Sequence, residues 1–322
     1  MTGKYEIELY NNRVHFFLEI KRNITIIQGD SATGKSTLIS LIADYERLGV
    51  GSGITLKCEK PCSVLNAGDW KNYLQNVHDH VIFMDENMPF IKSREFAERV
   101  NKSDNYFVII FRESLPQLAY SVEEIYGIRE DRDSQKYVNP RRVFNALYQI
   151  YNLEYPQKIK PTVVITEDSN AGYEFFSQVL PCTCVSAGGK TLVHSKIAEM
   201  EDDRETIIAI VDGAAFGADM QRAMREIKLK KGKCLLYAPE SFEYLILRSG
   251  VVEVPDKYLD EPYNYADSAR YASWERYFTD QLSEATRNTI YQYTKSKLNV
   301  IYLTAGNINR IMKLLPGVLE WN

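Results

Sequence analysis

The segment GDSATGKS at residues 29–36 constrains this chain more than any other. It fits the pattern G-x-x-x-x-G-K-[ST], in which successive backbone N–H groups surround a phosphate. Gly29 and Gly34 allow backbone angles that a side chain would disfavour. A helix beginning here would also turn the positive end of its dipole toward the same anion. The segment therefore predicts a site for a phosphate-bearing ligand between a strand and a helix.

The residues on either side of this segment support that prediction. Residues 23–28 (NITIIQ) are apolar and β-branched, which predicts a buried strand. Residues 35–47 predict a helix, because apolar side chains recur there at helical spacing, namely Leu38, Leu41, Ile42 and Tyr45. The residues expected to bind the phosphates are Gly29, Asp30, Ser31, Ala32, Thr33, Gly34, Lys35, Ser36 and Thr37.

Residues 80–86 (HVIFMDE) predict the second half of a nucleotide site. Four apolar residues followed by two acids indicate a buried strand that delivers Asp85 and Glu86 to the edge of a sheet. Ser36 and Asp85 are the expected Mg²⁺ ligands, and Lys35 would reach the β- and γ-phosphates. Glu86 would activate the attacking water. Lys35 and Glu86 are thus the predicted catalytic residues, with ATP and Mg²⁺ as cofactors; the alternative is a strand ending in a charged turn.

A further strand is predicted at residues 105–111 (NYFVIIF), beside the strand of residues 80–86. Arg112 or Ser114, at its end, could sense the nucleotide, and Arg112 could equally be a salt-bridged surface residue. Residues 121–128 could add a last strand.

The chain divides into two predicted domains. Its 322 residues favour two domains, and 45% hydrophobic and 25% charged residues are typical of a globular protein. Residues 141–152 predict a helix, and the proline-containing stretch after it predicts a linker. We therefore expect a nucleotide-binding α/β domain with a parallel sheet at residues 1–152, a linker at 153–161, and a second α/β domain with a helical tail at 162–322.

Composition excludes several other classes of protein. The net charge of −4 argues against a chain that binds nucleic acid over its whole surface. No apolar run approaches the roughly 20 residues that span a bilayer, and the first residues lack a signal-peptide core. A cytoplasmic protein with no membrane partner is expected, and its five cysteines are expected to be reduced.

Acidic residues follow two predicted strands of the second half. Residues 162–166 (TVVIT) precede Glu167, and residues 207–211 (IIAIV) precede Asp212. A helix predicted to begin at Pro239 would place two more acids three residues apart on one face. Since parallel strands end at one edge of a sheet, a second, Mg²⁺-binding cluster is expected from Glu167, Asp212, Glu240 and Glu243.

The order of strand, TE, strand and VDG in residues 160–250 resembles a Toprim domain, the Mg²⁺-binding module of topoisomerases, primases and nucleases. In that family a glutamate follows the first strand, and Glu167 matches it. Asp212 matches the first aspartate of the family's D-x-D pattern, where this chain has Ala214 in place of the second. The resemblance implies a metal site that Glu240 or Glu243 would have to complete.

An ATPase domain followed by a Toprim domain is also the order of the OLD-family nucleases, which act in phage defence. The first half, with NITIIQGDSATGKST and VIFMDE, resembles the ABC-type ATPase of that lineage. Between residues 37 and 85, however, no LSGGQ-like signature is present, and the usual helical insert has no room. The resemblance thus implies a minimal nucleotide-binding domain without the signature that acts across an ABC dimer.

These patterns predict an ATP-binding protein, an ATPase whose nucleotide state gates a Toprim-like domain with Mg²⁺-dependent nuclease or nucleic-acid-processing activity. DNA or RNA is the partner implied for the second domain, and a homo-oligomer is a candidate assembly. One alternative is an ATP-dependent regulatory or interaction protein with a catalytically inactive second domain. Another is a small-molecule kinase with an arginine-rich lid at residues 129–142.

Overall fold

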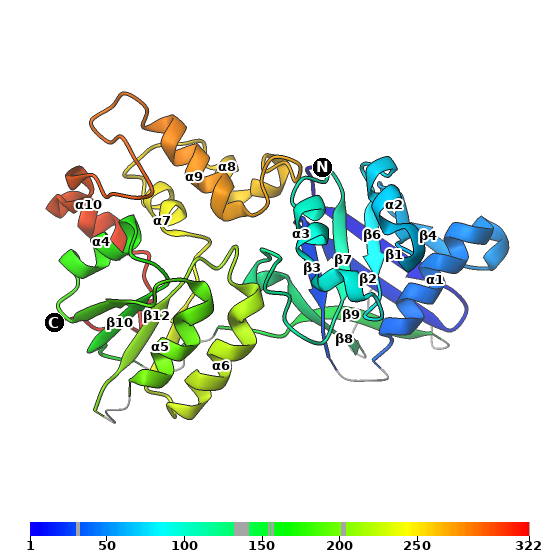
Figure 1. The fold of residues 1–322 in the computed structure, drawn as a ribbon, viewed down its shortest axis with the longest axis horizontal. Helices are drawn as coiled ribbons and strands as arrows, with labels where there is room; N and C mark the ends of the chain where they lie inside the picture. The colour runs from blue at the N-terminus through cyan, green and yellow to red at the C-terminus, as the bar shows by residue number, and fades with distance from the viewer. Residues whose placement is uncertain (30–32, 132–141, 154, 156–157, 201–203, 322) are drawn as a thin grey trace. The chain divides into compact units, whose positions relative to one another are not determined.

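The computed structural model describes residues 1–29, 33–131, 142–153, 155, 158–200 and 204–321. The chain forms two compact units (Figure 1). The first comprises Met1–Tyr151 and Tyr263–Ala272, and the second comprises Asn152–Pro262 and Ser273–Asn322. Each unit has its own sheet, flanked by helices, so the chain is an α/β protein.

The first unit is built on a nine-stranded, curled sheet. In spatial order its strands are β4 (Thr55–Lys57), β1 (Tyr5–Tyr10), β2 (Val14–Ile20), β9 (Val143–Gln149), β8 (Ile125–Glu130), β3 (Ile24–Ile27), β7 (Tyr106–Ile110), β6 (Val81–Met84) and β5 (Cys62–Val64). Strands β8, β3, β7, β6 and β5 pair in parallel, whereas β1 pairs antiparallel with β2 and β4, and β8 with β9. The sheet is therefore mixed. The predicted parallel sheet is confirmed for the strands expected at residues 23–28, 80–86 and 105–111, and antiparallel strands extend it on the β1 side.

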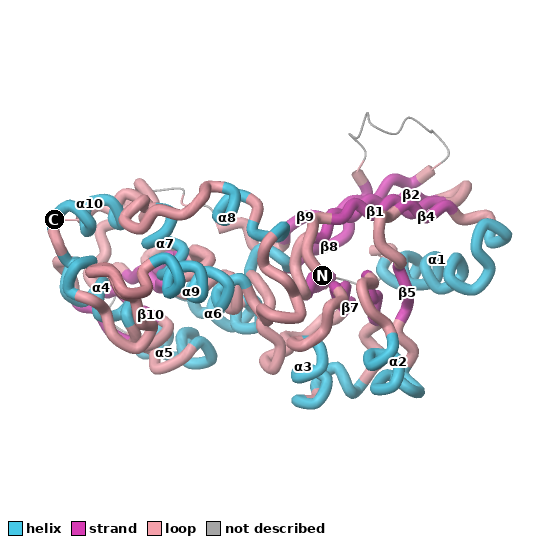
Figure 2. The backbone as a smooth tube through the Cα atoms, turned by 90° about the horizontal axis from the view of Figure 1, so that it is seen from above, coloured by secondary structure: helices cyan, strands magenta, loops and turns pink. Residues whose placement is uncertain are grey.

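Helices cover both faces of the central strands. The helices of this unit are α1 (Lys35–Leu48), α2 (Trp70–Asn76) and α3 (Arg94–Val100). Leu38 and Ile42 of α1 join one core with Phe83 and Val108, and the β1–β2 side of the sheet curls around the same core (Figure 2). On the other face, the Phe96 ring of α3 contacts Phe107 edge to face. Because β6 and β7 are covered on both faces, their sequences are continuous apolar runs.

The helix predicted at residues 141–152 is wrong, because Val143–Gln149 forms β9. This strand pairs in parallel with β2 and antiparallel with β8, so it joins the two halves of the sheet. Pairing on both sides outweighs the local preference for helix. Strands β1 and β2 form an antiparallel hairpin, in whose turn the Asn11 side-chain oxygen accepts hydrogen bonds from the backbone N–H groups of Arg13 and Val14.

A distant segment, Tyr263–Ala272, belongs to the first unit although it lies within the predicted second domain. The backbone N–H of Gly3 donates to the carbonyl of Tyr263 at 2.7 Å. The buried Asn23 amide donates to the carbonyls of Tyr271 at 2.7 Å and Ser268 at 3.3 Å. Asn23 immediately precedes β3, so the segment is attached beside the central strands.

The second unit contains a smaller sheet of four parallel strands. In spatial order these are β11 (Thr183–Ser186), β10 (Val163–Thr166), β12 (Ile207–Ile210) and β13 (Cys234–Tyr237). Its helices are α4 (Ala171–Val179), α5 (Val193–Glu199), α6 (Met220–Leu229), α7 (Phe242–Arg248), α8 (Lys257–Asp260), α9 (Trp274–Ala285) and α10 (Ala305–Met312). The predicted helical tail is confirmed for α9 and α10, which are separated by an irregular segment with one short 3₁₀ turn at Val300–Leu303.

Within the ranges that the structure describes, no helix combines the length and the apolar character needed to cross a membrane. All five cysteines are free.

Candidate functional sites

The predicted phosphate loop lies between β3 and α1, at the centre of the nine-stranded sheet. Gly29 and Gly34 have φ angles of 116° and 90°, so both use backbone conformations that glycine favours. Helix α1 begins at Lys35, and the carbonyl of Gly34 accepts its first backbone bond, from Leu38 at 2.9 Å. Predicted loop residues that lie outside the described part are Asp30, Ser31 and Ala32.

Lys35 lies across the base of this loop. Its side chain is buried, with 7% of the residue exposed. The ammonium donates to the Gly29 carbonyl at 2.8 Å and to the Thr33 hydroxyl at 2.9 Å. Ser36 and Thr37 follow in the first turn of α1 and are exposed. The Lys35 ammonium is thus held in place by oxygen atoms of Gly29 and Thr33.

The predicted acids follow β6, and strand β7 separates β6 from β3. The predicted neighbour relation between the strands of residues 80–86 and 105–111 is confirmed by parallel pairing, with Met84 opposite Ile109. The carboxylate of Asp85 accepts a hydrogen bond from the backbone N–H of Glu86 at 2.8 Å. Because the three strands run parallel, the loop, the two acids and the end of β7 share one edge of the sheet.

Arg112 follows β7 and forms an ion pair with Glu86. Its Nε lies 2.8 Å from Oε2 of Glu86, and the two side chains are 52% and 31% exposed. The sequence left Arg112 as either a nucleotide sensor or a salt-bridged surface residue. The structure shows the ion pair, and the partner of Arg112 is Glu86, the predicted catalytic acid.

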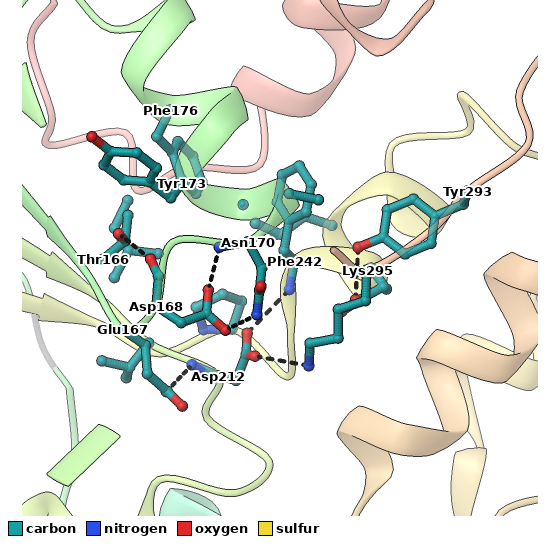
Figure 3. A pocket seen from close by; sticks show the side chains of 17 residues that line it. Thr166, Glu167, Asp168, Asn170, Tyr173, Phe176, Asp212, Phe242, Tyr293 and Lys295 are labelled. Atoms are coloured by element: carbon teal, nitrogen blue, oxygen red, sulfur yellow. Dashed lines mark hydrogen bonds and ion pairs between the residues drawn. The ribbon is translucent and has the colours of Figure 1, made fainter. Parts of the chain in front are cut away.

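In the second unit, two of the predicted acids meet at the carboxyl ends of β10 and β12 (Figure 3). Oε2 of Glu167, just beyond β10, accepts from the backbone N–H of Asp212 at 3.1 Å. Oδ1 of Asp212 accepts from the backbone N–H of Phe242, the first residue of α7, at 3.3 Å. Adjacent parallel strands therefore bring Glu167 and Asp212 together, as their positions in the sequence predicted.

The chain places a cation of its own beside these acids. The ammonium of Lys295 lies 3.9 Å from Oδ2 of Asp212 and forms a closer ion pair with Glu275 of α9. The carbonyl of Lys295 accepts from the backbone N–H of Ala171 at 3.1 Å, which fixes this segment against the start of α4. Lys295 consequently occupies the side of Asp212 that faces the C-terminal helices.

The prediction that Glu240 and Glu243 share one helix face is wrong. Helix α7 begins at Phe242, and Ser241 is its N-cap, with a hydroxyl that accepts from the backbone N–H of Tyr244 at 3.2 Å. Glu240 therefore precedes the helix. Glu243 is inside it and only 1% exposed. Among the described residues, no group of three or more His, Cys, Asp or Glu side chains is placed to hold a metal ion.

Burial and like charges dominate the electrostatics of this edge. Burial raises the pKa of Asp212 well above its usual range, and Glu275, Glu167 and Glu243 raise it further, against the opposing effect of Lys295. Burial raises the pKa of Glu167 to about 7, although the hydrogen bond from Asp212 lowers it. Burial alone would lower the pKa of Lys295, but the surrounding carboxylates raise it above its ordinary value. Burial and neighbouring carboxylates therefore favour the protonated forms of Glu167 and Asp212, against the opposing effects of Lys190 and Lys295.

The residues that sequence reasoning missed come from the C-terminal segment: Glu275, Tyr293 and Lys295. They lie between 65 and 129 residues after the ends of β12 and β10, and no spacing pattern connects them with Glu167 or Asp212. The sequence also gave no indication that Asp168 and Asn170, in the loop after β10, would be hydrogen-bonded to each other. Their loop is closed locally, because Oδ1 of Asp168 accepts from the backbone N–H of Asn170 at 3.0 Å.

No protein-family model and no curated protein sequence matches this chain. The functions of both sites are therefore argued from their residues.

Glu167→Gln is expected to change how stability depends on pH. The raised pKa means that folded Glu167 binds its proton more tightly than the unfolded chain does. This stabilisation is complete below pH 4.5 and is lost as the pH rises to about 7. The variant lacks this loss, so its unfolding free energy relative to wild type should rise by at least about 1 kcal/mol between pH 5 and pH 8. Urea unfolding at these pH values measures the difference, with the exposed Glu253→Gln as control; a difference independent of pH would contradict the prediction.

Gly213→Ala is expected to destabilise the second unit by about 1–3 kcal/mol. A Cβ at Gly213 would lie 2.5 Å from the carbonyl oxygen of Ala238 and 2.8 Å from that of Pro239, so backbone would have to move. Gly306, in α10, has open space around its Cβ position. Its replacement by alanine should therefore leave stability equal or raise it by up to about 1 kcal/mol. Thermal unfolding of both variants is the measurement, and equal melting temperatures would count against the close approach at Gly213.

Proposed function

We propose that the first unit binds ATP with Mg²⁺ and hydrolyses it. The observation that carries this proposal is the shared sheet edge: the loop with its buried Lys35 follows β3, and Asp85 and Glu86 follow β6 in the same direction. A phosphate bound by the loop amides and Lys35 would lie at the edge to which both acids are delivered.

The side chains available at this edge fit the parts of such a reaction. Lys35 binds the phosphates and offsets their charge. The Ser36 hydroxyl and the Asp85 carboxylate are hard oxygen donors, which suit Mg²⁺, and the ion would neutralise charge on the phosphates when bound. Glu86 orients the water and takes its proton. The Arg112 ion pair is half-exposed and worth about 0–1 kcal/mol, so releasing Glu86 from it costs little.

Water is favoured over an organic acceptor because a glutamate stands directly after Asp85, where a nucleophile would be activated. The stretch of residues 129–142, which could serve as a kinase lid, lies mostly outside the described residues. Release of phosphate from ATP with no added acceptor separates an ATPase from a kinase.

Lys35→Ala should weaken ATP binding about 10- to 100-fold, because it removes a charge-assisted contact to phosphate. Glu86→Gln should bind ATP like wild type and lose about 100-fold or more in turnover, since only the base is removed. Calorimetric titration and phosphate release measure the two effects. Lys71→Ala, which removes an exposed lysine, is the matched control. Equal ATP binding by wild type and Lys35→Ala would exclude the proposed site.

For the second unit, we propose a binding or regulatory role without metal-dependent phosphodiester chemistry. The residues do not fit the Mg²⁺ site that the Toprim resemblance implies. Ala214 stands in place of the second aspartate, Glu240 precedes α7, and the ammonium of Lys295 pairs with Asp212. This supports the alternative in which the ATPase is joined to a domain that binds rather than cleaves.

The purified chain is accordingly expected to leave single- and double-stranded DNA and RNA intact in Mg²⁺ or Mn²⁺, with or without ATP. The assay is gel electrophoresis of labelled substrates, and wild type is compared with Asp212→Ala to exclude a contaminating nuclease. Cleavage by wild type that disappears in Asp212→Ala would restore the nuclease interpretation.

A further inference from the structure

Two cysteines flank the connection between β4 and β5 in the first unit. Cys58 directly follows β4, and Cys62 is the first residue of β5. These strands are the first and the last in the spatial order of the nine-stranded sheet, and helix α1 contacts both of them. The connection at residues 59–61 therefore joins the two edge strands of the curled sheet, with a thiol at each end.

The two thiols interact directly. They are hydrogen-bonded to each other, and Sγ of Cys62 also lies 3.7 Å from the carbonyl oxygen of Lys60. Both side chains pack against the core that α1 covers, but to different depths. Cys62 is 9% exposed, whereas Cys58 is half-buried and stands between the exposed Lys57 and Glu59. A reagent arriving from solvent would therefore meet Cys58 before Cys62.

The hydrogen-bond donors around Cys58 favour its thiolate form. The hydrogen bond from Cys62 has the largest effect, and backbone N–H groups of Lys60 and Glu59 act in the same direction. Together they lower the pKa of Cys58 to about 7, against the opposing effects of burial and the Glu59 carboxylate. The pKa of Cys62 is raised, because the same hydrogen bond and burial favour its thiol form. Since the thiolate is the nucleophilic form of cysteine, Cys58 is the attacking sulfur of the pair.

The other three cysteines have different surroundings. Burial raises the pKa of Cys182, and it raises the pKa of Cys184 and of Cys234 to about 12. A structural metal ion would need about four ligands, and among the described residues no group of three or more His, Cys, Asp or Glu side chains is placed to hold one. The pair of Cys58 and Cys62 is therefore suited to thiol chemistry rather than to metal binding.

We propose that Cys58 is a modification site for small-molecule disulfides and that Cys62 completes the reaction. In the first step the Cys58 thiolate attacks one sulfur of a disulfide RSSR, which forms a bond from Sγ to SR and releases RS⁻. In the second step Cys62 loses its proton to solvent, and its thiolate attacks Sγ of Cys58 and releases the second RS⁻. The two cysteines are oxidised by two electrons to a Cys58–Cys62 disulfide, and RSSR is reduced to two thiols once the released RS⁻ groups take up protons.

The test treats the reduced full chain, without nucleotide, with excess oxidised glutathione at neutral pH. Remaining thiols are alkylated at successive times, and the cysteine peptides are quantified by mass spectrometry. The Cys58 thiol should disappear about 10-fold or more faster than that of Cys184, because a much larger fraction of Cys58 is thiolate. The product in wild type should be the Cys58–Cys62 disulfide, with no glutathione retained on Cys58.

Two variants separate the roles of the cysteines. Cys62→Ser should retain one glutathione on Cys58, because the second step is lost. Cys58→Ser should lose the fast reaction altogether, since Cys62 is buried and its thiol form is favoured. The matched control is Cys182→Ser, which removes another partly exposed thiol and should form the Cys58–Cys62 disulfide like wild type.

Three results would overturn the proposal. Loss of the Cys58 thiol no faster than that of Cys184 would mean that Cys58 is not activated. A stable glutathione adduct on Cys58 in wild type would mean that Cys62 does not reach it. Fast oxidation of Cys62 in Cys58→Ser would place the attacking sulfur elsewhere. If a variant does not fold, as judged by its thermal transition, the rate and the product measured for wild type still decide.

Discussion

Parallel hydrogen bonding of β3, β7 and β6 fixes the relative positions of the residues that we propose to act in the first unit. A slip of one residue in these strands would exchange the side chains facing α1 with those facing α3, so two close-packed cores would have to repack. The ends of the three strands are therefore fixed relative to one another to within a residue. Packing of the apolar strand residues therefore sets the positions of the side chains that follow the strands, namely the loop, Arg112, Asp85 and Glu86.

The second unit uses the same arrangement with a different outcome. Strands β10 and β12 again deliver acids to one edge, and the hydrogen bond from Asp212 to Glu167 shows how close the strand ends are. Here, however, a later part of the chain covers the edge. Lys295 supplies positive charge beside Asp212, where Mg²⁺-dependent phosphodiester cleavage would require a metal ion. The Tyr293 hydroxyl donates a hydrogen bond to one oxygen of Glu243. The parallel strands thus bring the acids together at one edge, and the segment with Tyr293 and Lys295 determines which partners those acids have.

The sequence was most informative where a signal is local. The predicted phosphate loop has glycine at two positive φ angles, and the buried parallel strands β6 and β7 are continuous apolar runs, so both could be predicted from residues alone. It failed for β9, whose state depends on pairing with the preceding strand β8 and with β2, which is more than 100 residues away in the sequence. It also failed for Glu240 and Lys295. Ser241 caps α7, so Glu240 lies before the helix rather than on its face, and Lys295 comes from a distant segment.

The attachment of Tyr263–Ala272 beside Asn23 has a consequence for how the protein is made. During synthesis, most of the first unit emerges before the second, yet the carbonyls that bind the Asn23 amide emerge only after most of the second unit has been translated. The first unit consequently cannot complete its native contacts on the ribosome until residue 272 has left the exit tunnel. A gene fragment that stops after the predicted linker would encode a first unit without the segment Tyr263–Ala272.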